Sequence, residues 1–181
     1  MLYTTDKLAL LIDGQALTSV GHQLNMKIDY RRLKTHFARS AKLTTAKYYA
    51  VVDTESVDNP YMKLLDWLEY NGYRVHKKAA RVYENNEGSR NIKGSVVTDL
   101  SVDMVMMATH VDHIILASGY HDYTYAVTQA QRLGARVSLL SSLQVDGFRP
   151  ADELRRIADD VIELDHLRSE IAITDSARTA A

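Results

Sequence analysis

Hydrophobic and polar positions along the chain predict short buried strands that alternate with amphipathic helices. Residues 8–12 and 114–117 are unbroken apolar runs, which is typical of strands buried on both faces of a parallel sheet. After the second run, Tyr123, Val127 and Ala130 recur at helical spacing. The expected strands are residues 8–12, 42–52, 73–83, 114–117, 136–140 and 161–164, and the expected helices are residues 15–24, 30–40, 60–70, 96–109, 123–133 and 151–158. This alternation predicts a single α/β domain with a parallel sheet flanked by helices.

Two of the predicted strands end in a turn that carries an aspartate. Residues 8–12 run straight into Asp13, and residues 114–117 lead through Ser118-Gly119 to Asp122. In open parallel sheets, ligands bind beyond the carboxyl ends of the strands, where the strand order reverses. If these two strands are neighbours, Asp13 and Asp122 converge at that place. Paired carboxylates there are typical of a site for a divalent cation.

Composition limits which classes of protein and which kinds of functional site are possible for this chain. The 181 residues suffice for one domain with a substantial core, and 46% hydrophobic with 25% charged residues is ordinary for a globular protein. A net charge of −1 creates no global attraction to nucleic acid or membrane, so any contact with nucleic acid has to come from a local patch. The absence of cysteine excludes disulfides, thiolate zinc sites and cysteine nucleophiles.

No segment of the sequence has the pattern of a membrane or secretion signal. The first residues lack the basic and apolar regions of a signal peptide. No apolar run approaches the roughly 20 residues that a membrane-spanning helix needs. We therefore expect a cytoplasmic protein without a membrane partner. RNA, a protein partner and a second copy of the chain are the partners that the sequence leaves open.

Four short motifs stand where predicted strands end or predicted helices begin. They are Ile12-Asp13-Gly14-Gln15-Ala16, Lys93-Gly94-Ser95-Val96-Val97, Ser118-Gly119-Tyr120-His121-Asp122-Tyr123 and Ala151-Asp152-Glu153-Leu154-Arg155-Arg156. In this order and at this spacing they resemble the motifs of the NYN family, the PIN-like ribonuclease domains also called LabA-like. The resemblance covers residues 6–167, which we expect to form one NYN/PIN-like domain. Residues 168–181 are then a C-terminal extension that we expect to be partly disordered, fraying from about residue 173.

The resemblance implies both a fold and a reaction. The fold is a PIN-like, Rossmannoid parallel sheet in which the strands that precede Asp13 and Asp122 are adjacent. The reaction is hydrolysis of RNA phosphodiesters, in which carboxylates hold Mg²⁺ or Mn²⁺ and the metal activates water. The resemblance makes Asp13 and Asp122 the candidate catalytic and metal-binding residues. Mg or Mn is the candidate cofactor, and no other cofactor is expected.

Three positions depart from the family's pattern and weaken the implied site. Ala16 stands where the family has Asn, Val97 where it has an acidic residue, and Tyr120 where it has the first Asp of the turn. None of these side chains carries an anionic oxygen at neutral pH. We therefore expect a domain with weakened or lost catalysis that binds RNA or a protein as a regulatory module. The alternative is an active Mg- or Mn-dependent ribonuclease with a reduced acidic site.

Asp99 and Asp103 are weaker catalytic candidates. They lie one turn apart on one face of the predicted helix 96–109. That face is turned away from Val97, so replacing the lost acid would require the helix to rotate. An ion-paired or solvated helix face is the alternative for both residues, just as capping of the following helix is the alternative for Asp13 and Asp122.

Contacts with nucleic acid are expected from the basic stretch at residues 74–93 and from the turn after the strand 114–117. The candidates are Lys93, Arg90, Lys78, Tyr120 and His121, since cations bind phosphates and aromatic rings stack on bases. Each has an alternative interpretation. The basic stretch is also typical of a solvated edge strand with protective lysines. Tyr120 is also suited to fill the volume of a lost metal site, and His121 to be a polar surface residue.

Overall fold

A six-stranded parallel sheet forms the centre of the molecule. The computed structural model describes residues 2–53, 60–84, 90–145 and 149–173. The sheet has the order β3-β2-β1-β6-β7-β8, and every pair of neighbours is parallel. Its strands are β1 Lys7–Asp13, β2 Lys42–Val52, β3 Arg74–Ala79, β6 His113–Ala117, β7 Arg136–Ser141 and β8 Asp160–Glu163. The predicted α/β domain with a parallel sheet is confirmed.

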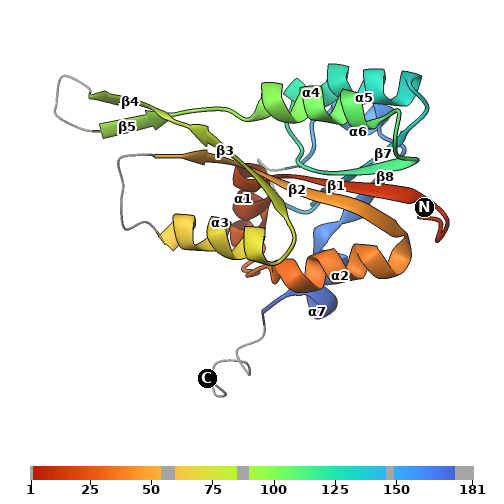
Figure 1. Cartoon of the computed structure of the whole chain (residues 1–181), viewed down its shortest axis with the longest axis horizontal. Coiled ribbons are helices and arrows are strands. Elements are labelled where there is room, and N and C mark those ends of the chain that lie inside the picture. The colour runs from red at the N-terminus through yellow and green to blue at the C-terminus, as the bar shows by residue number, and fades with distance from the viewer. Residues whose placement is uncertain (1, 54–59, 85–89, 146–148, 174–181) are drawn as a thin grey trace.

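Helices cover both faces of this sheet (Figure 1). One face carries α1 Gly14–Gln23, α2 Tyr30–Ser40, α3 Pro60–Tyr70, the short turn η2 Leu164–Leu167 and α7 Arg168–Ile171; the other carries α4 Val97–Met107, the short turn η1 His121–Tyr123, α5 Thr124–Arg132 and α6 Asp152–Ile157. Side chains of β1 alternate between the two layers. Leu8, Leu10 and Ile12 belong to the first core and Ala9 and Leu11 to the second, and all are fully buried. This burial on both faces explains the unbroken apolar run of β1.

The strand order reverses between β1 and β6, the two strands whose adjacency the family resemblance implied. From β1 the chain moves outward through β2 to β3, and from β6 it moves outward through β7 to β8. Ile12 at the end of β1 is paired with Ala117 at the end of β6, so the two strands end level. The turns that carry Asp13 and Asp122 therefore meet at the carboxyl edge of the sheet, where open parallel sheets bind ligands.

Residues 73–83 differ from the single strand that the sequence pattern predicts. β3 ends at Ala79, level with the end of β2 at Val52. The chain then forms β4 Arg81–Glu84, which pairs antiparallel with β5 Arg90–Lys93 as a separate hairpin that projects beyond the sheet (Figure 1). The reason is the length of the neighbouring strand. Beyond Val52, β2 offers no further backbone groups, so the β-prone residues that follow pair with the next segment of the chain.

Residues 168–173, which the resemblance assigns to the C-terminal extension, pack against α2 and the loop before it. The amide of Asp29 donates to the carbonyl of Ile171 at 2.7 Å, and the amide of Ile173 donates to the carbonyl of Lys27 at 2.8 Å. This start of the extension is therefore tied to the domain by backbone hydrogen bonds. The fraying predicted beyond residue 173 lies outside the described residues.

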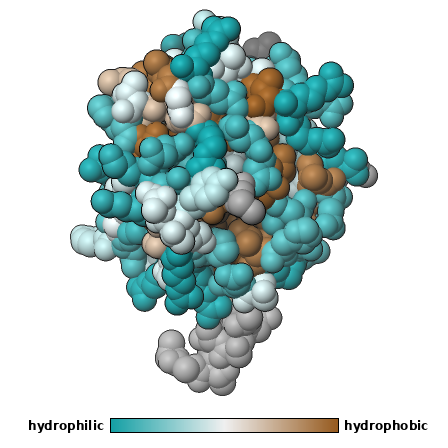
Figure 2. Space-filling view, turned by 90° about the vertical axis from the view of Figure 1, so that its right-hand side faces the viewer, coloured by the Kyte–Doolittle hydropathy of each residue, from teal (hydrophilic) through white to brown (hydrophobic). Residues whose placement is uncertain are grey.

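The helices of the described ranges are short. None of them has both the length and the apolar character needed to cross a bilayer. Figure 2 views the end of the molecule at which β1 begins. Hydrophilic residues dominate this face, and apolar residues form separate patches between them.

Candidate functional site

Asp13 lies at the junction of β1 and α1 with its side chain buried. It is the last residue of β1 and the N-cap of α1, and 2% of its surface is exposed. Its Oδ1 accepts a hydrogen bond from the amide of Ala16 at 3.1 Å, and its Oδ2 accepts one from the hydroxyl of Tyr123 at 2.8 Å. Burial raises the pKa of Asp13, while these hydrogen bonds act in the opposite direction. The protein itself therefore engages both carboxylate oxygens.

Tyr123 reaches Asp13 from the turn that follows β6. It is the last residue of η1, directly precedes α5 and is fully buried. Burial and the nearby carboxylate of Asp13 raise the pKa of Tyr123 far above its ordinary value, so its hydroxyl stays protonated at physiological pH. This hydroxyl donates to Oδ2 of Asp13 and adds no negative charge. Tyr123 is thus both a core residue and the fixed partner of the buried aspartate.

Two glycines allow the turns after β1 and β6 to approach the adjoining chain. A Cβ at Gly14 would lie 2.5–2.6 Å from ring and hydroxyl atoms of Tyr48, whose side chain is fully buried. A Cβ at Gly119 would lie 2.9 Å from the backbone Cα of Pro150. Neither neighbour can move without disturbing close packing. A glycine at each position is therefore a requirement of the geometry of this edge.

Asp13 and Asp122 line the same small cavity, which has a volume of about 240 Å³. Its wall consists of Asp13, Gln15, Gly94, Ser95, Val96, Val97, Tyr120 and Asp122. The side chain of Asp122 is 55% exposed, and its carboxylate lies 3.5 Å from Nε2 of His121. The structure therefore brings the two predicted acids to one place, with Val97 and Tyr120 as neutral groups in the same wall.

The oxygen atoms of this cavity do not fit a firmly bound Mg²⁺ or Mn²⁺. Mg²⁺ requires several oxygen ligands in near-octahedral geometry. Asp13 already accepts hydrogen bonds at both oxygens, and Gln15 and Ser95 offer neutral oxygens alone. Across the described residues, no group of three or more His, Cys, Asp or Glu side chains is placed to hold a metal. Asp13 and Asp122 together leave the ligand set incomplete.

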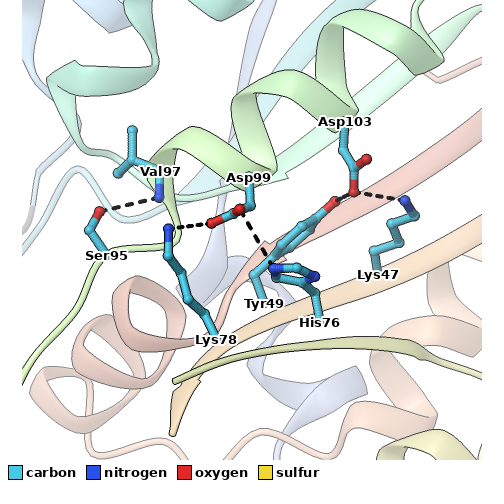
Figure 3. A network of polar contacts seen from close by, with 8 residues as sticks. All are labelled: Lys47, Tyr49, His76, Lys78, Ser95, Val97, Asp99 and Asp103. Carbon is cyan, nitrogen blue, oxygen red and sulfur yellow. Dashed lines mark hydrogen bonds and ion pairs between the residues drawn. The ribbon is translucent and has the colours of Figure 1, made fainter. Parts of the chain in front are cut away.

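Asp99 and Asp103 of α4 are ion-paired with lysines of the neighbouring strands (Figure 3). A carboxylate oxygen of Asp99 accepts from Nζ of Lys78 at 2.6 Å. Asp103 accepts from Nζ of Lys47 at 2.7 Å and from the hydroxyl of Tyr49 at 2.5 Å. Neither aspartate belongs to the wall of the small cavity. Their contacts are those of the alternative interpretation, an ion-paired helix face.

The ionisation of these two aspartates follows from the same contacts. The hydrogen bond from Lys78 lowers the pKa of Asp99. Partial burial favours the neutral form of Asp103, but hydrogen bonds from Lys47 and Tyr49 outweigh it and lower the pKa of this carboxyl as well. Both groups are therefore anionic at neutral pH, and each is committed to a cation on β2 or β3.

A larger cleft of about 960 Å³, here called the basic cleft, adjoins the small cavity. Gln15, Gly94 and Ser95 belong to the walls of both. The remaining lining residues are Gly14, Thr18 and Ser19 of α1, Val51 of β2, Tyr61 of α3, Lys78 and Ala79 of β3, Arg81 of β4, Lys93 of β5 and Thr98 of α4. The wall thus combines cationic side chains with hydroxyl and amide groups that donate hydrogen bonds.

The residues predicted to contact nucleic acid divide between these two hollows. Lys78 and Lys93 line the basic cleft, whereas Tyr120 lines the small cavity. His121 is exposed next to Asp122. The side chain of Arg90 lies outside the described part of the structure. The structure therefore brings the two lysines together. It leaves His121 outside the cavity wall, beside Asp122, which with Asp13 forms what is here called the acid pair.

Sequence reasoning missed the polar residues that helices contribute to the basic cleft. Gln15, Thr18 and Ser19 come from the first two turns of α1, and Thr98 comes from the first turn of α4. The signal that identifies them is their position directly after Asp13-Gly14 and Lys93-Gly94. Polar residues one helical turn beyond such motifs face the same edge of the sheet.

Comparisons with known proteins agree with this fold. The chain is similar to the crystal structure of VPA0982, a protein of unknown function from Vibrio parahaemolyticus RIMD 2210633, with 22% identity and a TM-score of 0.73 over 93% of this chain and 97% of that one. This likeness concerns the fold alone. The chain also has a remote likeness to the tetrameric inhibited form of phosphofructokinase-2 from Escherichia coli. The identity is 13% and the TM-score 0.39, over 76% of this chain and 55% of that one.

The family is established by a comparison with family models. No curated protein matches the sequence. The model described as NYN domain matches residues 7–165. This match contains the acid pair, the basic cleft and every strand of the sheet. The chain therefore belongs to the NYN domain family, a ribonuclease-like family.

Proposed function

We propose that this NYN domain binds single-stranded RNA in the basic cleft and has weakened or lost metal-dependent hydrolysis. The observation that carries the proposal is the continuity of the two hollows. Lys78, Arg81 and Lys93 line a cleft whose wall runs, through shared residues, into the cavity of Asp13 and Asp122. A backbone held by these cations would pass directly beside the acid pair of a ribonuclease-like fold.

Electrostatics favour a phosphate-bearing ligand at this cleft although the chain carries a net charge of −1. Lys78, Arg81 and Lys93 each bring a positive charge to the wall of the cleft, and the charge of Lys78 is partly compensated by Asp99. Side chains such as Thr18 add neutral hydrogen-bond donors. Binding of a single strand through three phosphates weakens with salt, with a slope of log K against log[salt] of about −2.

The chemistry of the acid pair supports the loss of hydrolysis. Asp13 accepts hydrogen bonds from Ala16 and Tyr123 at its two oxygens. Asp99 and Asp103 are paired with lysines outside the small cavity. Within the described ranges, no further carboxylate joins Asp13 and Asp122 in that wall. Metal-assisted hydrolysis needs a metal held in a fixed geometry, and these donors do not provide one.

Fluorescence anisotropy with a short single-stranded RNA tests binding. In the presence of EDTA, the wild-type protein is expected to bind with the salt slope given above. The Arg81→Ala/Lys93→Ala variant is expected to bind about tenfold more weakly, because two phosphate contacts are lost. Lys77→Ala is the matched control, since Nζ of Lys77 contacts Asp66 and Glu69 on the other side of the sheet. Wild-type protein without affinity for RNA, or with the same affinity as the double variant, would remove the basis of the proposal.

Cleavage of end-labelled RNA in millimolar Mg²⁺ or Mn²⁺ tests the second half of the proposal. The wild-type protein is expected to cut no faster than the Asp13→Asn/Asp122→Asn variant. Metal-dependent cutting that is present in the wild type and lost in this variant would establish the alternative, an active ribonuclease with a reduced acidic site.

A further inference from the structure

We infer that the basic cleft holds an unpaired nucleobase of the RNA against the ring of Tyr61, while the cations of the cleft hold the adjoining phosphates. The inference rests on the proposed binding of single-stranded RNA and deepens it. It assigns the contact with the base to one residue of α3 that the sequence analysis did not single out. The ligand class is then a strand whose bases are accessible, since cations alone do not distinguish such a strand from other phosphate-bearing ligands.

The basic cleft has an apolar part beside its cations. Val51 of β2, Tyr61 of α3 and Ala79 of β3 form this part, here called the apolar wall. Val51 is paired with Lys78 at the carboxyl ends of β2 and β3, so the apolar and cationic parts adjoin. The volume of about 960 Å³ lies within the range of about 300–1,000 Å³ that is typical of sites for small organic ligands. The cleft therefore has room for a base in addition to phosphates.

Tyr61 is anchored in the core and also reaches the cleft. It is the second residue of α3 and is half-buried, and it packs against the core that contains Leu65 and Leu68 of the same helix. The same side chain belongs to the wall of the basic cleft. Burial raises the pKa of Tyr61, so the side chain stays neutral at physiological pH and does not repel phosphates. A ring that packing already holds loses little conformational entropy when a ligand stacks on it.

The cations of the cleft lie together where the hairpin of β4 and β5 leaves the sheet (Figure 1). Arg81 and Lys93 are paired residues at the base of this hairpin, so their side chains share one face. Lys78 lies three positions before Arg81, near the end of β3. A strand whose phosphates follow these cations brings its bases to the same cleft. An aromatic ring beside a row of cations is the arrangement by which proteins bind single strands, with bases stacked on the ring.

Two other kinds of ligand fit the wall less well. Contacts through phosphates alone would engage the cations and leave the apolar wall uncovered. In a duplex, the faces of the bases are covered by the neighbouring base pairs, so Tyr61 could not stack on them. An unpaired base covers the apolar wall and removes it from water, which is favourable. The wall as a whole therefore fits a single strand with accessible bases.

Fluorescence anisotropy in EDTA with two labelled strands tests the inference on the full-length chain. One strand is oligouridylate, whose bases stack weakly on one another, and the other is an abasic strand of the same length, which keeps the phosphates and lacks the bases. The wild-type protein is expected to bind oligouridylate about five- to tenfold more tightly than the abasic strand, the effect of stacking on one ring. Equal affinity of the wild type for the two strands overturns the inference, and this comparison needs no variant.

Variants of Tyr61 test whether this ring causes the preference. Tyr61→Leu is expected to bind both strands with the affinity that the wild type has for the abasic one, and with an unchanged salt slope, because no charge is lost. Tyr61→Phe keeps the ring and is expected to keep the preference. Tyr70→Leu is the matched control, since Tyr70 lies at the other end of α3, is 91% exposed and does not belong to the wall of the cleft. A full preference retained in Tyr61→Leu overturns the inference.

The same titrations separate this inference from the proposed function. A wild-type protein that binds neither strand removes both. A wild-type protein that binds the two strands equally removes the inference and leaves binding through phosphates in place. The Arg81→Ala/Lys93→Ala variant is expected to bind both strands more weakly by the same factor, so that the ratio of the two affinities stays at the wild-type value.

Discussion

Lys77 and Lys78 are consecutive residues of β3 whose ammonium groups lie on opposite sides of the sheet. Nζ of Lys77 lies 3.1 Å from Asp66 and 3.3 Å from Glu69 of α3, whereas Nζ of Lys78 lies 2.6 Å from Asp99 of α4. Successive side chains of a strand point to opposite faces, so the basic stretch is divided between two surfaces. Of this pair, Lys78 alone belongs to the wall of the basic cleft.

Replacing these two lysines is expected to have different effects on RNA binding. Lys78→Met should weaken binding about three- to tenfold and reduce the magnitude of the salt slope by about 0.7, because one phosphate contact is lost. Lys77→Met should leave both quantities unchanged. Anisotropy titrations at several salt concentrations measure them. Equal losses in the two variants would place the RNA on another surface.

Asp99→Asn is expected to strengthen RNA binding. The carboxylate of Asp99 compensates the charge of Lys78 at the edge of the basic cleft, and its removal leaves that cation for a phosphate. The gain should be about threefold at low salt and should vanish at high salt, as expected for a partly exposed charge. Asp103→Asn is the matched control, because Asp103 lies one turn further along α4 and contacts Lys47. A gain of the same size in both variants would point to overall charge instead of the pair with Lys78.

The strands, the helices and the meeting of the two acids follow from sequence patterns because each rests on a strong local signal. The predicted helices at residues 30–40 and 60–70 have the observed bounds, and Asp29 caps the first of them, with its side chain accepting from the amide of Arg32. Asp13 and Asp122 follow apolar runs whose burial on both faces requires the centre of a parallel sheet. Their convergence then depends only on the adjacency of two strands.

The remaining features depend on relationships between distant residues. The strand predicted at residues 73–83 breaks after Ala79 because its neighbour β2 ends at Val52, and no local pattern near residue 80 encodes the length of β2. The hydroxyl of Tyr123 meets Asp13 across 110 positions of sequence. Its aromatic ring alone predicts burial, and the direction of the hydroxyl depends on how the turn after β6 packs against β1.

His113 makes the stability of the fold depend on pH. It is 1% exposed at the start of β6; its Nε2 lies 2.8 Å from Oγ of Ser138, and its Nδ1 lies 3.9 Å from Asp6, which pairs with Arg136. Burial, together with the positive charge of Arg136, lowers the pKa of His113 to about 4, against the opposing effect of Asp6 and Asp159. The native state therefore keeps this imidazole neutral at pH values where the unfolded chain binds a proton.

The sign of the pH dependence follows from this difference in proton binding. The contribution of His113 to the free energy of unfolding is fully present above pH 6.5. It decreases as the pH falls toward 4, by up to about 3 kcal/mol in total. Urea unfolding at several pH values measures it. The difference in unfolding free energy between wild type and His113→Gln should shrink across this range as the pH falls. His110→Gln, at an exposed position, should keep the wild-type pH dependence; a constant difference for His113→Gln would contradict the prediction.

Asp13→Asn is expected to stabilise the protein, whereas Asp13→Ala is expected to destabilise it. Burial raises the pKa of Asp13, so the folded state binds its proton more tightly than the unfolded chain does, and ionisation at neutral pH opposes folding. The oxygen of a neutral amide can still cap α1, while its NH2 group donates to the oxygen of Tyr123 in place of the bond that Tyr123 now donates. The free energy of unfolding should therefore rise by up to about 1 kcal/mol, or about 2–4 °C in melting temperature.

Alanine at position 13 removes the cap of α1 and leaves the buried hydroxyl of Tyr123 without its acceptor. These losses should lower the free energy of unfolding by about 2–4 kcal/mol. Calorimetric melting of both variants in EDTA measures the contrast. If asparagine destabilised the fold as much as alanine, the negative charge itself would be stabilising, which would mean that the hydrogen bonds from Ala16 and Tyr123 outweigh the effect of burial. A charged residue that lowers the stability of the fold is typical of a position kept for binding or catalysis. Stabilisation by asparagine would therefore mark Asp13 as part of a functional site inherited from the ribonuclease-like fold.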